Sequence, residues 1–165
     1  MKTEVRTPIA AYIALGANQG DPGALIVQAM NDIASLGGVS LLHRSSLYRT
    51  APVDSSGPDY VNAVVAISTV WTAPELLAQL QQLEQLAGRE RPYRNAPRTL
   101  DLDILIYGEA RMDGATLVIP HPRMWERAFV LVPLAEIAPH AVTPAQLLAV
   151  QAQLIERLPK NAAHG

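Results

Sequence analysis

The chain has 165 residues, 49% of them hydrophobic, with a formal net charge of -2 and no cysteine. This length predicts one domain over residues 1–165, with residues 1–8 and 159–165 as loose ends. The lack of cysteine excludes disulfides, thiol nucleophiles and Cys-ligated zinc, and the near-neutral charge argues against a nucleic-acid partner. No apolar run reaches the roughly 18 residues of a membrane span, and the N-terminus does not resemble a signal peptide, so we expect a cytoplasmic protein without a membrane partner.

The first half of the chain predicts a strand, a helix and two further strands. Residues 11–15 form a short apolar run, and Asp21 followed by Pro22 is typical of a helix N-terminus. Apolar residues at helical spacing follow as far as the Gly37-Gly38 pair, which is expected to end the helix: Ile26, Ala29, Met30 and Ile33. Residues 39–49 and 60–70 then predict neighbouring strands.

The second half predicts a helix, a strand and a C-terminal extension. Thr72 and Glu75 have the spacing of a capping box, and Gly88 is placed to end that helix. Residues 100–107 alternate as in a strand, with Leu100, Leu102, Ile104 and Ile106 on one face and Asp101, Asp103, Leu105 and Tyr107 on the other. Prolines interrupt residues 117–139, where we expect no long element. Thr143 is expected to begin a last helix with a stripe that ends in Leu154, Ile155 and Leu158.

This order of elements is typical of one fold class. Strand, helix, strand, strand, helix, strand predicts an α+β fold with a ferredoxin-like β-α-β-β-α-β core. We expect a largely antiparallel sheet with helices packed on it, plus a C-terminal helical extension. The fold alone does not indicate a function.

The strongest chemical signal is a carboxylate pair that follows an arginine-rich segment. Asp101 and Asp103 lie two residues apart on the predicted strand, so both side chains point to the same side and can converge on a cation. Hard oxygen ligands suit magnesium, and arginine forks suit phosphate. The residues alone leave open that the aspartates only pair with arginines on a solvated strand end. The arginines within ten positions are Arg89, Arg91, Arg94 and Arg98.

The segment 96–108, APRTLDLDILIYG, closely resembles the signature of the 6-hydroxymethyl-7,8-dihydropterin pyrophosphokinase family. Segments 12–18, 48–53, 58–63, 119–124 and 127–131 are similar to other motifs of that family, in the same order, over roughly residues 10–140. The resemblance implies a folate-pathway enzyme that transfers pyrophosphate from ATP, its co-substrate, to the hydroxymethyl group of the pterin and releases AMP. It also implies that the protein is a monomer and that its partners are these two small-molecule substrates.

The resemblance assigns roles at the phosphate end of the site. Asp101 and Asp103 would hold two magnesium ions, and Arg89 and Arg98 would act with them as catalytic residues. A mobile loop that closes over the site would contain Arg91, Arg94 and Asn95. The implied ATP-binding residues are Gln81, Glu84, Arg89, Arg91, Arg98, Ile104, His121 and Arg127.

A second set of residues is implied at the pterin end. Tyr60 and Phe129 would stack on the flat ring, and Asn62 would read its edge by hydrogen bonds. Without the resemblance, either aromatic suits ordinary core packing, His121 suits a loop hydrogen bond, and residues 16–20 suit a turn. The full set implied to bind the pterin is Thr50, Ala51, Val53, Tyr60, Asn62 and Phe129.

The chain departs from the usual family pattern at a few positions. Asn95 replaces a tryptophan, Ala96 a glycine, Ala51 a proline and Pro122 a tyrosine. We expect these changes to alter loop closure or nucleotide contacts and to spare the chemistry. Two other interpretations are a nucleotidyltransferase that releases pyrophosphate and a noncatalytic ferredoxin-like ligand-binding module.

Overall fold

The structure is a computed structural model that describes residues 6–52, 57–88 and 100–159. Its centre is a six-stranded sheet in the order β5-β1-β4-β3-β8, with β2 also paired to β4. All pairings are antiparallel. The strands are β1 (Ile9–Ala17), β2 (Val39–Arg44), β3 (Tyr48–Thr50), β4 (Tyr60–Thr69), β5 (Asp101–Tyr107) and β8 (Glu156–Arg157). The ferredoxin-like order predicted from the sequence is confirmed, with its second strand divided into β2 and β3.

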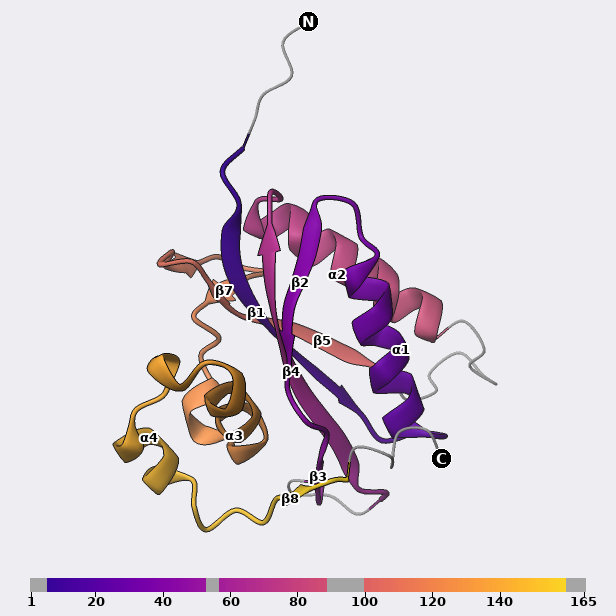
Figure 1. The fold of residues 1–165 in the computed structure, drawn as a ribbon, viewed down its shortest axis with the longest axis vertical. Helices are drawn as coiled ribbons and strands as arrows, with labels where there is room; N and C mark the ends of the chain where they lie inside the picture. The colour runs from indigo at the N-terminus through magenta and orange to yellow at the C-terminus, as the bar shows by residue number, and fades with distance from the viewer. Residues whose placement is uncertain (1–5, 53–56, 89–99, 160–165) are drawn as a thin grey trace, which may run out of the picture.

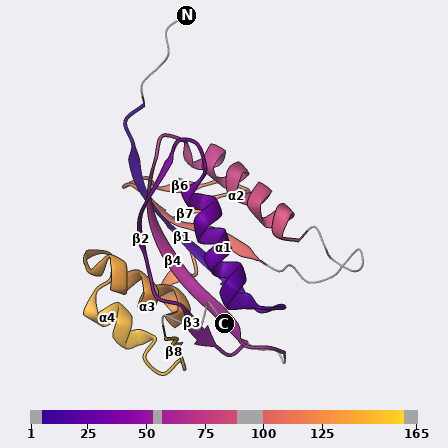
Figure 2. The same cartoon turned by 45° about the vertical axis from the view of Figure 1, so that its right-hand side comes forward.

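Helices cover both faces of the sheet (Figure 1), and the turned view in Figure 2 shows the same three layers. One face carries α1 (Pro22–Ala34) and α2 (Ala73–Ala87). The other carries η1 (Met124–Glu126), α3 (Ala128–Ile137), η2 (Pro139–Ala141) and α4 (Pro144–Ala149). A separate hairpin, β6 (Met112–Asp113) with β7 (Val118–Ile119), follows β5. Each face has its own cluster of buried apolar residues.

The first two helices begin where the sequence predicts. The Asp21 side chain accepts from the backbone N–H of Ala24, and Thr72 and Glu75 form the complete capping box. These contacts satisfy N–H groups that have no partner within the helix. The predicted stripe of α1 is buried, but the helix ends at Ala34, one turn before Gly37.

The alternation predicted for residues 100–107 holds only as far as Ile104. Ile13 faces Ile104 and Tyr12 faces Ile106, so Leu105 is an extra residue in β5. This β-bulge reverses the faces that follow: Ile106 packs in the α3 cluster and Tyr107 in the α1 and α2 cluster. The faces predicted for Ile106 and Tyr107 were therefore wrong, because a strict period of two contains no signal for a bulge.

The prediction that no long element lies between residues 117 and 139 was also wrong. Helix α3 has ten residues and contains Pro133 in its interior. Proline removes a helical hydrogen bond, but Val130, Leu131, Pro133 and Leu134 are all buried. Burial of this apolar face against the sheet offsets the lost bond.

The C-terminal extension is less helical than the sequence predicts. Thr143 caps a helix through its capping box with Gln146, yet α4 ends at Ala149. Residues 156–157 instead form β8, which pairs with β3. Leu154 is 87% exposed, so it does not continue a buried stripe. Pairing with the otherwise open edge of β3 satisfies backbone groups that a longer helix would leave unpaired.

Candidate active site

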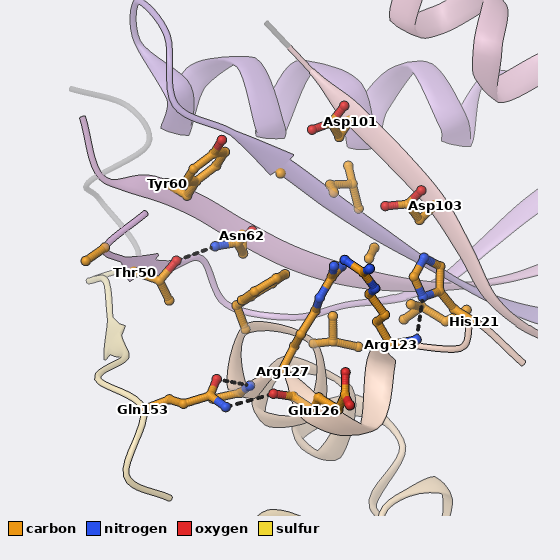
Figure 3. Close-up of a pocket in the computed structure, with 18 of the residues that line it drawn as sticks. Thr50, Tyr60, Asn62, Asp101, Asp103, His121, Arg123, Glu126, Arg127 and Gln153 are labelled. Carbon is orange, nitrogen blue, oxygen red and sulfur yellow. Dashed lines mark hydrogen bonds between the residues drawn. The ribbon is translucent and has the colours of Figure 1, made fainter. Parts of the chain in front are cut away.

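A cavity of about 990 Å³ lies between the sheet and the segment from His121 to Leu154. We call its two sides the sheet wall and the C-terminal wall, and Figure 3 shows labelled residues of both, with Arg123 and Arg127 reaching from the C-terminal wall toward the sheet. The sheet wall includes Ala14, Gly16, Thr50, Ala51, Tyr60, Asn62, Asp101 and Asp103. The C-terminal wall includes His121, Arg123, Glu126, Arg127, Phe129, Gln153 and Leu154.

The sheet wall is built on one row of residues across three strands. Gly16 on β1 faces Asp101 on β5 and Asn62 on β4. A Cβ atom at Gly16 would lie 3.0 Å from Asn62 Oδ1. Residues 16–20 were expected to serve in a turn and in packing. Gly16 itself lies within β1, where its lack of a side chain leaves the floor of the cavity open between the carboxylate and the amide. No sequence feature distinguishes that role from a turn glycine.

Asp101 and Asp103 are exposed at one end of the sheet wall, while Leu102 and Ile104 between and beside them are buried in the core. The predicted direction of the two carboxylates is therefore confirmed. In the described parts of the chain no cluster of three or more Asp, Glu, His or Cys side chains could hold a metal by itself. Mg²⁺ is usually held by one or two carboxylates together with substrate phosphates, so the two aspartates fit this ion and its preference for oxygen.

Asn62 and Thr50 form a buried polar pair at the other end. Asn62 Nδ2 donates to Thr50 Oγ1 at 2.8 Å, and both residues are buried. Asn62 Oδ1 has no hydrogen bond within the described residues, and no buried side-chain polar atom there lacks a partner. The oxygen therefore faces the cavity, where it can accept from a ligand. Tyr60 is half-buried beside this pair and lines the cavity.

His121 lies on the C-terminal wall at the carboxylate end of the cavity. Its backbone N–H donates to Leu105 O at 2.9 Å, and its Nδ1 accepts from the backbone N–H of Arg123 at 3.2 Å. Burial lowers the pKa of His121, and Arg127 and Arg123 lower it further, against the opposite effect of Asp103. The ring is therefore neutral near pH 7, and its Nε2 carries the proton because Nδ1 is an acceptor.

Phe129 and Arg127 mark the centre of the C-terminal wall. The Arg127 guanidinium carbon lies 5.3 Å from the centre of the Phe129 ring. Both residues line the cavity at the start of α3, opposite the sheet residues Tyr60 and Asn62. The wall thus combines a ring that can stack on a flat ligand with a cation that can contact an anion.

Two long-range side-chain contacts hold the C-terminal wall in place. Gln153 Oε1 accepts from Ala128 N at 2.9 Å, and its Nε2 donates to Glu126 O at 2.7 Å. Because Arg127 makes no side-chain cap, Gln153 supplies the capping acceptor for α3. Gln153 was not predicted as a site residue, because no local sequence pattern indicates a contact between residues 25 positions apart.

Glu136 on α3 provides the second contact. Its carboxylate accepts from Ser46 N, Ser46 Oγ, Tyr48 OH at 2.7 Å and Arg157, which joins α3 to β3 and β8. Partial burial raises the pKa of Glu136, but the hydrogen bonds from Tyr48 and Ser46 and the charge of Arg157 outweigh it and lower the pKa. Burial, with the Glu136 hydrogen bond, raises the pKa of Tyr48 to about 12.

The cavity brings together most of the predicted site residues that the structure describes. Thr50, Ala51, Tyr60, Asn62, Asp101, Asp103, His121, Arg127 and Phe129 all line it. Ile104 is buried in the core on the other face of the sheet, and Gln81 is exposed on α2. Glu84 Oε2 accepts from Leu102 N at 2.8 Å, beneath the aspartates. Outside the described residues lie Val53, Arg89, Arg91, Arg94, Asn95 and Arg98.

Comparison with known proteins places the chain among pterin pyrophosphokinases. Two relatives named 2-amino-4-hydroxy-6-hydroxymethyldihydropteridine pyrophosphokinase are similar to it. The one from Haemophilus influenzae is 42% identical over 156 residues, which cover 94% of each chain. The one from Methylorubrum extorquens is 44% identical over 133 residues, 80% of this chain and 84% of the relative.

The fold has solved counterparts. The wild-type HPPK-DHPS of Plasmodium falciparum matches 83% of this chain with a TM-score of 0.62 and 15% identity. The chain spans about two fifths of that structure, 39% of its length, and the likeness bears on the fold alone. A model of the family described as 7,8-dihydro-6-hydroxymethylpterin-pyrophosphokinase matches residues 12–139, most of the chain. The chain therefore belongs to the 7,8-dihydro-6-hydroxymethylpterin-pyrophosphokinase family.

Proposed function

We propose that the protein transfers the pyrophosphoryl group of ATP to the hydroxymethyl group of 6-hydroxymethyl-7,8-dihydropterin, releasing AMP, as a step in folate biosynthesis. Family membership supports the reaction. The observation that carries it is that one cavity joins an exposed carboxylate pair to a buried Asn62–Thr50 pair. A polyphosphate with its cation suits the first end, and a flat polar heterocycle suits the second.

At the pterin end, this chain's residues orient the acceptor. Tyr60 from the sheet wall and Phe129 from the C-terminal wall supply two ring faces for stacking. Asn62 Oδ1 accepts from a donor on the pterin edge, and the Asn62 amide stays fixed by its bond to Thr50. Ala51 also lines this end, and the family resemblance assigns Val53 a role in pterin binding. The held ring directs its hydroxymethyl group toward the aspartates.

At the phosphate end, Asp101 and Asp103 would hold two Mg²⁺ ions, which when bound neutralise phosphate charge and orient the triphosphate. The pterin hydroxyl oxygen forms a bond to the β-phosphorus, the bond from this phosphorus to the α-phosphate oxygen breaks, and the hydroxyl proton is released. Arg127 and the Nε2–H of neutral His121 donate to the phosphate oxygens. Positioning and charge neutralisation account for most of such a reaction, so no strong base is required.

The remaining assignments rest on the family resemblance. Arg89 and Arg98 act on the phosphates, Gln81, Glu84 and Ile104 lie near the nucleotide, and a loop with Arg91, Arg94 and Asn95 closes over the site. The protein acts as a cytoplasmic monomer on its two small-molecule substrates. In the described part of the chain, no helix combines the length and apolar character needed to cross a membrane.

The test is a product assay with ATP, Mg²⁺ and 6-hydroxymethyl-7,8-dihydropterin. We expect AMP and the pterin pyrophosphate to form in equal amounts, only when the pterin is present, and we expect EDTA to stop the reaction. Release of pyrophosphate instead of AMP would identify a nucleotidyltransferase. Pterin binding without any nucleotide product would identify a binding module. Either result would refute the proposal.

A further inference from the structure

Arg123 is a cation of the cavity with no protein partner among the described residues. It lines the same space as Arg127, and its guanidinium group makes no hydrogen bond or ion pair within residues 6–52, 57–88 and 100–159. Figure 3 shows both arginine side chains directed from the C-terminal wall toward the interior of the cavity. No role of Arg123 was predicted from the sequence.

The local backbone gives Arg123 an obvious alternative partner that it does not use. Glu126 lies three residues later in the 3-10 turn η1, where side chains three positions apart stand above one another. No ion pair joins Glu126 to Arg123 within the described part of the chain. The Arg123 side chain is instead directed into the cavity (Figure 3), where its charge and that of Arg127 both lower the pKa of His121. The two positively charged guanidinium groups near His121 repel each other, and an anion bound between them would relieve this repulsion.

The position of this pair indicates which anion it receives. Arg127 lies over Phe129, the ring that would stack on the pterin. On the opposite side, the charge of Asp103 on the sheet wall raises the pKa of His121, which the two arginines lower. A phosphate held by both arginines therefore lies between the pterin end and the carboxylates. In the proposed reaction, that place belongs to the group that moves to the pterin and not to the phosphate that leaves with AMP.

We propose that Arg123 is a further phosphate-binding residue of this site, which with Arg127 holds the transferred β- and γ-phosphates against the wall that carries Asp101 and Asp103. This inference rests on the proposed function for the identity of the moving group. A planar guanidinium fork can bind two phosphate oxygens at once, which an ammonium group cannot do.

The test is nucleotide binding by calorimetry, with Mg²⁺ and without pterin, to wild type, Arg123→Ala and Arg123→Lys. The ligands are α,β-methylene ATP, whose bond between the α- and β-phosphates does not break, and AMP. We expect Arg123→Ala to lower the affinity for the ATP analogue about tenfold, the scale of one charge-assisted hydrogen bond. The affinity for AMP should not change. Arg123→Lys should restore only part of the affinity, because it keeps the charge and loses the fork.

Arg111→Ala is the matched control, since Arg111 is an exposed cation outside the cavity lining. Unchanged affinity of Arg123→Ala for the ATP analogue would overturn the proposal. An equal loss of affinity for AMP and for the analogue, or an equal effect of Arg111→Ala, would also overturn it. The proposed function is tested separately by pterin-dependent AMP release from the wild-type protein. If the wild-type protein releases no AMP but Arg123→Ala still selectively lowers the affinity for the ATP analogue, the contact of Arg123 with the polyphosphate is supported. Only the proposed acceptor is then wrong.

Discussion

The two walls of the cavity are built in different ways. The sheet wall belongs to β1, β3, β4 and β5, and its chemical residues stand on strands that are joined by continuous backbone ladders. The C-terminal wall depends on side-chain contacts between distant positions: Gln153 holds the start of α3 within the wall, and Glu136 joins α3 to the scaffold through Tyr48. Substitutions in the sheet wall should therefore change chemistry or recognition first, and substitutions in the C-terminal wall should change its attachment first.

The largest effect is expected at the carboxylates. Asp101→Asn and Asp103→Asn should each lower kcat by about a thousandfold, since cation-assisted charge stabilisation contributes several kcal/mol to such reactions. Both side chains are exposed, so the melting temperature should move by less than about 2 °C. Steady-state kinetics and thermal unfolding measure the two effects. Asp113→Asn, an exposed acid on β6, is the control. Unfolding of either site variant would show that the pair is structural.

Thr50→Val should give the next largest effect and is the sharper test of the sheet wall. It leaves the buried Asn62 Nδ2 without its acceptor, which costs about 1–3 kcal/mol of unfolding free energy. The freed amide also loses its orientation, so KM for the pterin should rise about tenfold with little change in KM for ATP. Thr69→Val removes a buried hydroxyl that accepts from Trp71 N, far along β4 from the cavity. If both variants changed KM for the pterin equally, the effect would be general destabilisation.

Gln153→Ala should loosen the C-terminal wall by about 1 kcal/mol, the usual cost of losing a helix cap. Hydrogen exchange of the Ala128 and Phe129 amides should accelerate, and KM for the pterin should rise, because Phe129 stands in the first turn of α3. Gln153→Glu keeps the acceptor for the Ala128 amide but replaces the donor to Glu126 O by a carboxylate oxygen, so it should retain only part of the protection. Gln151→Ala, an exposed neighbour, should have no effect. Slow exchange in Gln153→Ala would show that the wall is held without this contact.

Glu136→Gln should have the smallest effect, below about 1 kcal/mol, because part of this network is solvated. The pKa of Glu136 is lowered in the folded state, so its contribution is complete above the unfolded value and disappears as pH falls through the folded value. Wild type should exceed Glu136→Gln in urea stability at pH 7, and the difference should shrink as the pH is lowered and Glu136 becomes protonated. Glu156→Gln, whose ion pair with Arg49 is 4.0 Å long and exposed, is the control. A difference that grows toward low pH would contradict this assignment.

The same contrast explains what could be predicted from the sequence. Caps, stripes and alternation are local patterns, so β1, α1, α2, β4 and the direction of Asp101 and Asp103 followed from neighbouring residues alone. The family resemblance added Tyr60, Asn62, His121, Arg127 and Phe129, which all line the cavity.

What local patterns missed depends on tertiary contacts. Pro133 is tolerated in α3 because the helix is buried, and residues 156–157 become a strand because β3 has an open edge. Gln153 and Arg123 carry no local signal, since each is defined by what lies opposite it in space. Gly16 belongs to the same group, because its role depends on the Asn62 side chain across the ladder.

Leu105, the extra residue of β5, gives the chain a fixed point of return after the hairpin. It has no direct partner on β1, and its carbonyl accepts a hydrogen bond from the backbone N–H of His121. The chain that leaves the sheet after Tyr107 is thereby bound back to the same strand, two positions from Asp103. A change in the length of residues 108–119 should therefore leave this contact, and the position of His121 relative to Asp103, in place.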